Sequence, residues 1–316
     1  MSDATPTRIG QVAGAGDTRA LFLKLFSGEV LTVYDAECVM KNHVRQRTIS
    51  SGKSSQFPTF AGTVAEYHTP GAEITGNVIK HDEKVITIDD LLIAHTFVPR
   101  IDELMSHYEV RAEYSKRLGQ ALAQTYDRNL LSMAVKAARD PSGLGAGAEG
   151  QDDAEVINVG TSPTVDQLVA GFYSAAQKFD EKNIPAEGRV AIVSPAVYWA
   201  MVTSDKLVNR DYVRANGDYA SGKMWEVAGI KIIKSNNLAV DHTSDTVDYG
   251  TKYQVDASDT AAVLLHGDAL GTVKLMELAT EAEWDIRRQG TLMVAKQAVG
   301  HGILRPEGII EIRKHA

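Results

Sequence analysis

The sequence predicts an α+β fold in which one long helix and several long strands accompany a compact α/β unit. The helix is expected over Ile101 to Arg139, because this stretch holds no proline and its apolar residues recur at helical spacing. A long strand is expected over Lys84 to Val98, which is rich in β-branched residues. After Thr164 short helical and extended patterns alternate, and this alternation is typical of a compact α/β unit.

Size and composition indicate a globular protein of one large domain or two smaller ones. The chain has 316 residues, of which 44% are hydrophobic and 23% are charged. Its formal net charge of −8 argues against a dedicated nucleic-acid-binding protein. The single cysteine, Cys38, excludes an intrachain disulfide framework and a zinc site built on cysteines. No apolar run could span a membrane and no signal-peptide core is present, so we expect a soluble protein made in the cytoplasm.

The N-terminal part is expected to be an extended tail followed by a short helix. Residues 1–16 are rich in glycine and small polar residues. Asp17 is a good N-cap for a helix over Thr18 to Phe26, and Gly28 is expected to end that helix. A small basic cluster follows, and taken alone it is most simply a solvated face. The cluster consists of Lys41, Arg45 and Arg47.

Residues 49–98 are expected to form a long hairpin. Thr63 to Tyr67 can form a strand, and His68 to Gly71 carries a turn signal. The distal half of this hairpin is too polar to hold a core of its own. Because an isolated two-stranded ribbon is marginally stable in water, we expect another part of an assembly to cover it, such as a neighbouring subunit.

The long helix is bounded by prolines. Pro99 marks its upstream limit, and Asp140-Pro141 ends it because proline cannot continue a helix. A break near His107 is possible. Leu122 lies in the apolar stripe, which we expect to pack on the long strands. On its own, the helix is typical of an ordinary α/β enzyme core.

The second half of the chain supplies shorter elements. Thr164 with Gln167 three residues later forms a capping-box pattern that begins a helix. Ser194-Pro195 is an N-cap followed by a first-turn proline for a helix over Ala196 to Val202. Gly300-His301-Gly302 is expected to bend the chain. The expected strands are Arg189 to Val193, Val227 to Lys234, Val273 to Leu278, Thr291 to Val299 and Ile309 to Ile312.

No motif predicts a catalytic, cofactor-binding or metal site. Gly52-Lys53-Ser54 imitates the end of a phosphate-binding loop, but Arg47 stands where its first glycine would fall. Gly145 to Gly150 matches the dinucleotide-binding pattern, yet it follows a helix rather than a strand and is expected to be a loop. His301 has no candidate nucleophile beside it in sequence.

Six blocks of sequence resemble the major capsid proteins of short-tailed double-stranded-DNA phages of the coliphage T-seven type. Together they run from the N-terminal arm to the C-terminal segment, and the acidic stretch 141–163 and residues 236–260 do not share the resemblance. The matching blocks are Phe22 to Thr32, Ser50 to Pro58, Ile79 to Asp89, His107 to Tyr114, Gly271 to Leu275 and Ala298 to Glu307.

This resemblance implies a Hong Kong 97-like capsid fold and gives names to its parts. Residues 1–48 would be the N-arm and 49–97 the extended E-loop hairpin. Residues 98–163 would hold the spine helix of the P-domain and the following loop. Residues 164–270 would form the inserted A-domain, 271–302 would return to the P-domain as strands, and 303–316 would add a C-terminal A-domain strand.

The function that the resemblance implies is assembly. Copies would associate as hexamers and pentamers into an icosahedral shell, the virion capsid, around packaged double-stranded DNA. Expected partners are other copies of the chain, a scaffolding protein, a portal protein at one vertex and possible decoration proteins, with no membrane. One alternative is a bacterial nanocompartment shell of the same fold, which would enclose a cargo enzyme. The other is a cytoplasmic α/β enzyme using Gly145 to Gly150 as a nucleotide loop; particle size and nucleic-acid content separate the three.

Two sets of residues are candidate assembly sites. The E-loop set is expected at subunit interfaces and comprises Phe57, Tyr67, His68, Pro70 and Gly71. The basic set, Lys41, Arg45 and Arg47, is expected to face inward near DNA phosphates through contacts that do not depend on base sequence. Acidic residues are concentrated in 141–280, whereas the arm and the helix are slightly basic. This distribution suits an interior lined by the arm and helix, because DNA repels acidic surfaces.

Overall fold

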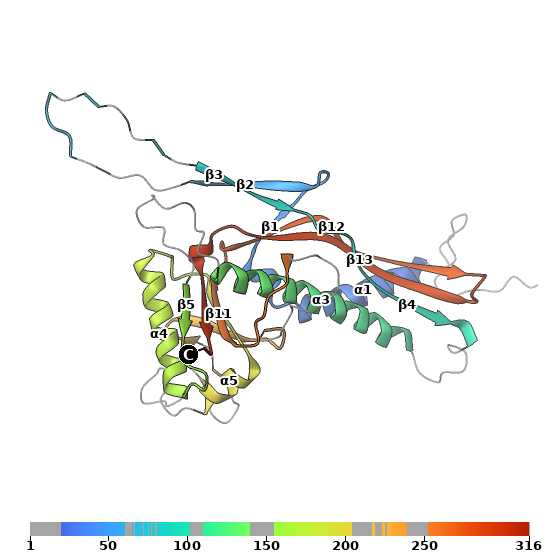
Figure 1. Ribbon diagram of the computed structural model, residues 1–316. Helices are drawn as coiled ribbons and strands as arrows, with labels where there is room; N and C mark the ends of the chain where they lie inside the picture. Colours follow the sequence, from blue (N-terminus) through green and yellow to red (C-terminus); the bar gives the residue numbers. More distant parts are fainter. Residues whose placement is uncertain are drawn as a thin grey trace, which may run out of the picture. The chain divides into compact units, whose positions relative to one another are not determined.

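A computed structural model describes residues 20–60, 81–101, 110–139, 155–203, 226–238 and 252–315, together with 65, 67–71, 73–74, 76, 78–79, 217–218 and 223–224 (Figure 1). The chain divides into two compact units. The first unit contains residues 1–39, 89–126 and 274–299, and the second contains 40–88, 127–273 and 300–316. Sequence patterns for 61–64, for a break near His107 and for the loop Gly145 to Gly150 lie outside the described residues.

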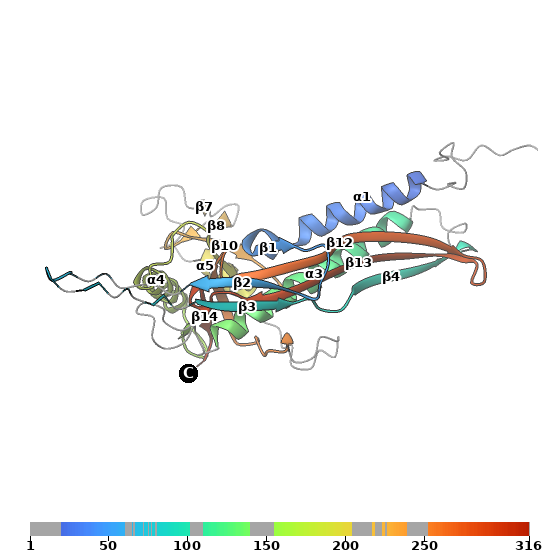
Figure 2. The same ribbon diagram turned by 90° about the horizontal axis from the view of Figure 1, so that it is seen from above.

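The first unit combines a long helix with a sheet of long strands. The part of helix α3 (Val110–Ala138) that belongs to this unit, residues 110–126, lies along one face of the sheet (Figures 1 and 2). Within this unit the strand order is β12-β13-β4. These strands are β12 (Leu270–Asp285), β13 (Gly290–Ile303) and β4 (Leu92–Pro99), and β1 (Arg45–Thr48) belongs to the second unit. The predicted packing of Leu122 is confirmed, since its side chain is only 1% exposed.

The two faces of this sheet differ in burial. Strands β13 and β4 are antiparallel, with Met293 opposite Thr96 and Val294 opposite His95. Along β13 the buried side chains alternate with partly exposed ones, as expected where one face of a sheet is covered. The buried set is Thr291, Met293, Ala295 and Gln297. This set marks the face that α3 covers.

Helix α1 (Ala20–Glu37) is longer than the sequence predicted. The expectation that Gly28 ends the helix is wrong. The helix continues because its later turns pack against α3: Val30 is fully buried, and the rings of Tyr34 and Tyr126 meet edge to face at 6.1 Å. The helices approach closely at Gly119, where an added Cβ would lie 2.9 Å from the Val30 carbonyl oxygen. Burial of this kind outweighs the roughly 1 kcal/mol that a glycine costs inside a helix.

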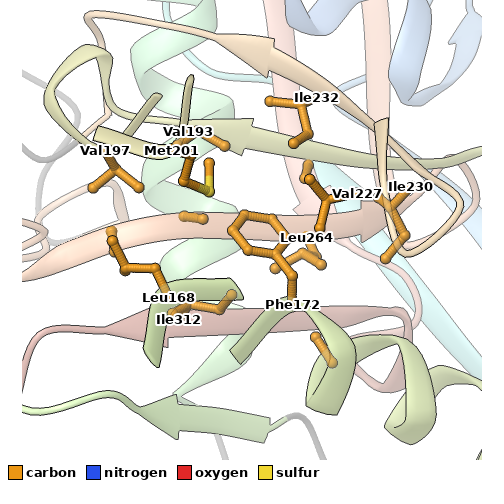
Figure 3. Close-up of a cluster of buried hydrophobic side chains, with 14 of the residues drawn as sticks. Leu168, Phe172, Val193, Val197, Met201, Val227, Ile230, Ile232, Leu264 and Ile312 are labelled. Carbon is orange, nitrogen blue, oxygen red and sulfur yellow. The ribbon is translucent and has the colours of Figure 1, made fainter. Parts of the chain in front are cut away.

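The second unit is built on a six-stranded sheet of order β5-β14-β11-β6-β10-β9. Its strands are β5 (Glu155–Asn158), β14 (Ile309–Arg313), β11 (Thr260–His266), β6 (Arg189–Val193), β10 (Ile230–Lys234) and β9 (Glu226–Val227). Strand β11 is antiparallel to both β6 and β14, whereas β6 and β10 run parallel. The core brings Phe172 and Leu168 of one helix against Leu264 and Ile312 of the sheet (Figure 3).

Two helices of this unit begin near where the sequence placed them. Helix α4 (Val165–Glu181) has the predicted capping box, in which Thr164 and Gln167 bond each other's backbone N–H groups. Helix α5 (Pro195–Val202) has Ser194 at the N-cap position. The Ser194 hydroxyl makes no capping hydrogen bond, however, so this cap depends on backbone conformation and on Pro195 at the first position.

The strands of this unit differ in two places from those that the sequence predicted. The single strand expected over Val227 to Lys234 is two strands, β9 and β10, joined by a tight turn at Ala228 and Gly229. Both turn residues have positive φ, of 52° and 74°. This conformation is typical of two-residue hairpin turns, and alanine is an unusual residue for it. The central strand β11 was not predicted, although its five-residue apolar run, residues 261–265, bears the signature of a buried strand.

The expected long strand over Lys84 to Val98 is also wrong. It is divided between β3 (His81–Thr87), which among the described strands pairs with β2 (Ser54–Phe60) alone, and β4. Residues 88–91 separate the two strands and include Asp89 and Asp90. The short elements η1 (Met40–His43), β7 (Gly217–Asp218), β8 (Lys223–Met224) and η3 (Pro306–Gly308) complete the described secondary structure.

Candidate assembly surfaces

The base of the β2–β3 hairpin is fixed by a small apolar cluster within the second unit. Phe57 and Ile86, from the two strands, pack with Val273 and Leu304. The predicted bend at Gly300 to Gly302 is wrong, because β13 continues through these residues to Ile303. The two glycines instead allow close approach. A Cβ on Gly300 would lie 2.1 Å from the Thr87 carbonyl oxygen, and one on Gly302 would lie 2.7 Å from Ile86 Cγ1.

His301 stabilises the same base from the other side of the strand. Its side chain is 1% exposed, and its Nδ1 lies 3.0 Å from Thr272 Oγ1. Its backbone N–H donates to the Tyr253 hydroxyl at 3.3 Å, and the two rings meet edge to face at 6.0 Å. The neighbouring Lys252 ammonium donates to the Thr87 carbonyl at 3.5 Å. These contacts describe a histidine that packs inside its own chain, whereas the sequence had favoured a backbone bend at this position.

The distal part of the hairpin loop is exposed. Tyr67 has 105% relative exposure, and His68, Pro70 and Gly71 are exposed as well. Further along the loop, Ile74, Val78 and Ile79 present apolar side chains to solvent. None of these described loop residues belongs to a strand or helix of its own chain. The loop therefore carries apolar side chains that this chain leaves uncovered.

Phe57 differs from the other members of the predicted interface set. It is 6% exposed and belongs to the cluster at the hairpin base. The Arg47 guanidinium lies over its ring at 5.4 Å from the centroid. Phe57 is therefore packed within its own subunit, and we do not retain it as an interface residue.

The basic cluster Lys41, Arg45 and Arg47 lies on η1 and β1 of the second unit. Arg47 is held in place, since its guanidinium donates to the Gln56 carbonyl at 2.7 Å and to Ser55 Oγ at 3.3 Å. Arg45 is exposed and Lys41 is partly exposed. Nearby, burial together with the positive charge of Lys231 lowers the pKa of His43.

Two buried carboxylates of the second unit join elements that are distant in sequence. Asp127, on α3, is 1% exposed and accepts the backbone N–H of Met40, the first residue of η1, at 3.0 Å. Glu311, on β14, accepts two hydrogen bonds from Arg139 at 2.7 and 2.6 Å and one from Thr260 at 2.6 Å. The bonds to Glu311 raise the pKa of the Arg139 guanidinium. Neither anchor was predicted, because only the fold brings these distant residues together.

Within the described ranges no group of His, Cys, Asp and Glu side chains is arranged to hold a metal ion. Cys38 is buried and is not part of a disulfide. No helix in the described part of the chain combines the length and apolar character that crossing a membrane requires.

A long helix on a sheet, a second sheet unit and the β2–β3 hairpin are the parts of a Hong Kong 97-like capsid fold, and the comparisons support this class of protein. The sequence model described as "Gp10A-like: Major capsid protein" matches residues 56–313. The chain belongs to this family.

Relatives and solved structures agree with this assignment. The chain is 34% identical to the major capsid protein of Escherichia phage T7, over 94% of this chain and 92% of that one. It is 33% identical to the major capsid protein of Enterobacteria phage T3, over 95% and 93% of the two chains. Its fold is similar to the capsid structure of cyanophage P-SCSP1u, with a TM-score of 0.76, 35% identity and full coverage of both chains.

The principal prediction from sequence is therefore confirmed: this is a major capsid protein of T7-like phages, and it forms an icosahedral shell of the virion. The family is one of structural capsid proteins, and this membership implies a role in assembly. The nanocompartment alternative is disfavoured, because the matching family and relatives are phage capsid proteins.

Proposed function

We propose that this chain closes its shell by placing the loop between β2 and β3 on a neighbouring subunit, as an E-loop. The observation that carries this proposal is the exposure of Tyr67, Ile74 and Val78 on a loop that its own chain leaves uncovered. Burying a large apolar side chain is favourable by about 1.5–3 kcal/mol. A single contact of this size binds two subunits weakly. In a closed shell many such contacts form together, so the shell as a whole is stable.

The remaining parts take the roles that the sequence suggested. Residues 1–48 serve as the N-arm, 98–163 as the spine-helix region, 164–270 as the A-domain, and 271–302 and 303–316 as the returning strands. Interface contacts come from Tyr67, His68, Pro70 and Gly71. Assembly begins in the host bacterial cytoplasm with a scaffolding protein, and a portal protein takes one vertex. Decoration proteins are possible partners on the outside.

The side of the first unit that carries α1 and α3 faces the packaged DNA. Support comes from the opposite face of the sheet, where β12 exposes Glu277, Glu281 and Glu283, which lie four and two positions apart along the strand. Glu281 pairs with Lys296 of β13 at 2.5 Å. Lys296 alternates with the buried residues Ala295 and Gln297, so this acidic row lies away from α3. Phosphates would be repelled by that face, and Lys41, Arg45 and Arg47 are the candidates for facing DNA.

Replacement of the exposed loop side chains tests the E-loop proposal. A Tyr67→Ser, Ile74→Ser, Val78→Ser chain should fold normally by circular dichroism, yet assemble into shells at a several-fold higher critical concentration by light scattering. The matched control is Tyr173→Ser, which removes an exposed aromatic side chain from α4. Unchanged assembly of the triple variant contradicts the proposal. Electron micrographs of empty and DNA-filled wild-type particles test the shell itself.

A further inference from the structure

The segment that precedes β11 is held between two other parts of the second unit, and we call residues 252–257 the strap. Two of its side chains, Tyr253 and Ala257, are only 6% and 4% exposed. One set of contacts joins the strap to the C-terminal end of α3, and another joins it to the base of the β2–β3 hairpin. All the residues in these contacts belong to the second unit.

The contacts with α3 fix the backbone of the strap at two points. The Lys136 ammonium donates to the Lys252 carbonyl at 3.1 Å. The Arg139 guanidinium donates to the Asp256 carbonyl at 2.6 Å. Lys136 and Arg139 are three residues apart, a spacing that places two side chains on the same face of a helix. Because charged donors form stronger hydrogen bonds than neutral ones, the strap has a defined position relative to the end of α3.

The contacts with the hairpin come from the first two residues of the strap. The Lys252 ammonium donates at 3.5 Å to the carbonyl of Thr87, the last residue of β3. It also lies 5.1 Å from the centroid of the Tyr253 ring, so a carbonyl oxygen and an aromatic face both favour its positive charge. The Tyr253 hydroxyl accepts the backbone N–H of His301 at 3.3 Å. Lys252 therefore bonds α3 through its carbonyl and the hairpin through its ammonium.

A two-stranded ribbon that is held at its base is sensitive to small changes in direction. Strand β3 has seven residues, which corresponds to a length of roughly 20 Å. A rotation of about 10° at the base would move the far end of the ribbon by ~3–4 Å, as much as the distance between packed side-chain atoms. Four buried residues form the apolar cluster at the base, so a polar contact beside them can change the direction of the ribbon.

We propose that the strap sets the direction of the β2–β3 hairpin relative to the C-terminal end of α3, with Lys252 as the positioning residue. The inference rests on the proposed function, because the direction matters for assembly only if the loop of the hairpin reaches a neighbouring subunit. Lys252 acts through the hairpin rather than by touching the neighbour. A subunit with this contact holds its loop in the required direction before it meets a partner, so less conformational freedom is lost on binding.

Removal of the Lys252 ammonium tests this role in shell assembly. Lys252→Met keeps most of the aliphatic stem and removes the donor, so we expect assembly, followed by light scattering, to require a several-fold higher subunit concentration. Lys252→Arg should assemble like the wild type, because a guanidinium can donate to the same carbonyl. The matched control is Lys116→Met, which removes an exposed ammonium from α3. An equal defect in Lys116→Met overturns the inference, because it assigns the effect to net charge.

The direction of the hairpin can be measured in the unassembled subunit. Spin labels on His81→Cys, at the far end of β3, and on Tyr173→Cys of α4 report the distance between the hairpin and the six-stranded-sheet part of the second unit. Both positions are exposed. We expect pulsed electron paramagnetic resonance to show one narrow distance distribution, which Lys252→Met broadens or shifts. Lys136→Met should have the same effect, because it releases the strap from α3.

A second pair of labels is the control for a general loss of structure. Labels on Tyr173→Cys and Trp199→Cys lie on α4 and α5, outside the hairpin, and should give the same distance distribution in every background. The native Cys38 is buried and should stay unlabelled. A broad His81–Tyr173 distribution already present with an intact Lys252 overturns the inference, because the strap would then not fix the hairpin.

The possible outcomes separate this inference from the proposed function. An unchanged His81–Tyr173 distance in Lys252→Met overturns the inference, whether or not assembly is impaired. A changed distance with normal assembly also overturns it if the loop variant Tyr67→Ser, Ile74→Ser, Val78→Ser assembles poorly. If that loop variant assembles normally, the E-loop proposal fails instead. A changed distance, a several-fold assembly defect in Lys252→Met and its recovery in Lys252→Arg together support the positioning role.

Discussion

Single glycines decide how closely the strands of this protein can approach one another. Gly300 lies against the end of β3 so tightly that an added Cβ would lie 2.1 Å from a backbone oxygen and 2.8 Å from Ile88 Cα. These backbone atoms cannot move aside as the end of a flexible side chain could. The base of the β2–β3 hairpin can therefore lie this close to β13 only because residue 300 has no side chain.

Gly300→Ala is expected to displace the hairpin base and to destabilise the subunit by a few kcal/mol, within the range for overpacked cores. Urea unfolding of the unassembled subunit measures the loss. Gly267→Ala is the matched control, because nothing lies within 4 Å of a Cβ built there. Equal free energies of unfolding for the two variants would show that the close approach at Gly300 does not affect the stability of the subunit.

His43 is expected to make the subunit sensitive to mild acid. Burial and the charge of Lys231 lower its pKa in the folded chain. The unfolded chain therefore binds the proton more readily, so stability falls as pH drops through the ordinary histidine value, near 6.5. Unfolding at pH 7.5 and pH 5.5 should show this loss, and His43→Gln should reduce it. An identical pH dependence in His43→Gln assigns the loss to other groups.

At the scale of elements, the middle turns of α3 pack against α1 and are buried in the first unit. Gly119 receives the backbone of α1, and Leu122 is buried in the first unit. Further along the same helix, Asp127 holds the start of η1, and Arg139, just beyond the last turn, holds β14 through Glu311. The N-terminal part of α3 thus contributes buried apolar contacts, whereas Asp127 and Arg139 contribute hydrogen bonds and an ion pair toward its C-terminal end.

Leu122→Ala is expected to cost about 2–5 kcal/mol, the usual range for removing a fully buried leucine side chain. The free energy of unfolding measured by urea denaturation checks this value. Leu275→Ala gives a contrast, because Leu275 is 38% exposed and should cost much less. A loss below about 1 kcal/mol at Leu122 would mean that the core relaxes to fill the space.

At the scale of the whole molecule, charge is distributed unevenly although the net value is −8. The exposed glutamates of β12 are on the sheet face away from α3, whereas a basic cluster lies on η1 and β1. In a shell filled with DNA, phosphates would attract the basic cluster and repel the acidic face.

Replacing Lys41, Arg45 and Arg47 by glutamine is expected to leave empty shells intact but to weaken retention of DNA as salt rises. Packaged DNA released from purified particles across a salt series measures the effect. Because Arg47 also bonds Gln56 and stacks on Phe57, the variant Lys41→Gln, Arg45→Gln separates charge from local packing. Equal DNA retention by wild type and both variants would place the cluster away from the genome.

The sequence by itself determined the elements whose signals are local. The long α3 pattern, the capping box at Thr164 and the buried strand at Arg189 to Val193 all appear in the structure. The blocks shared with phage capsid proteins identified the family. Periodicity and caps depend on residues within a few positions of each other, so they are visible without a fold.

Only the tertiary structure decided which segments meet. It divided Lys84 to Val98 between two sheets, extended α1 past Gly28, and placed Gly300 and Gly302 as contact points rather than a bend. It also joined Asp127 to Met40 and Arg139 to Glu311, residues far apart in sequence. The physical reason is that burial and hydrogen bonding to distant partners outweigh local propensity, and local sequence does not specify those partners.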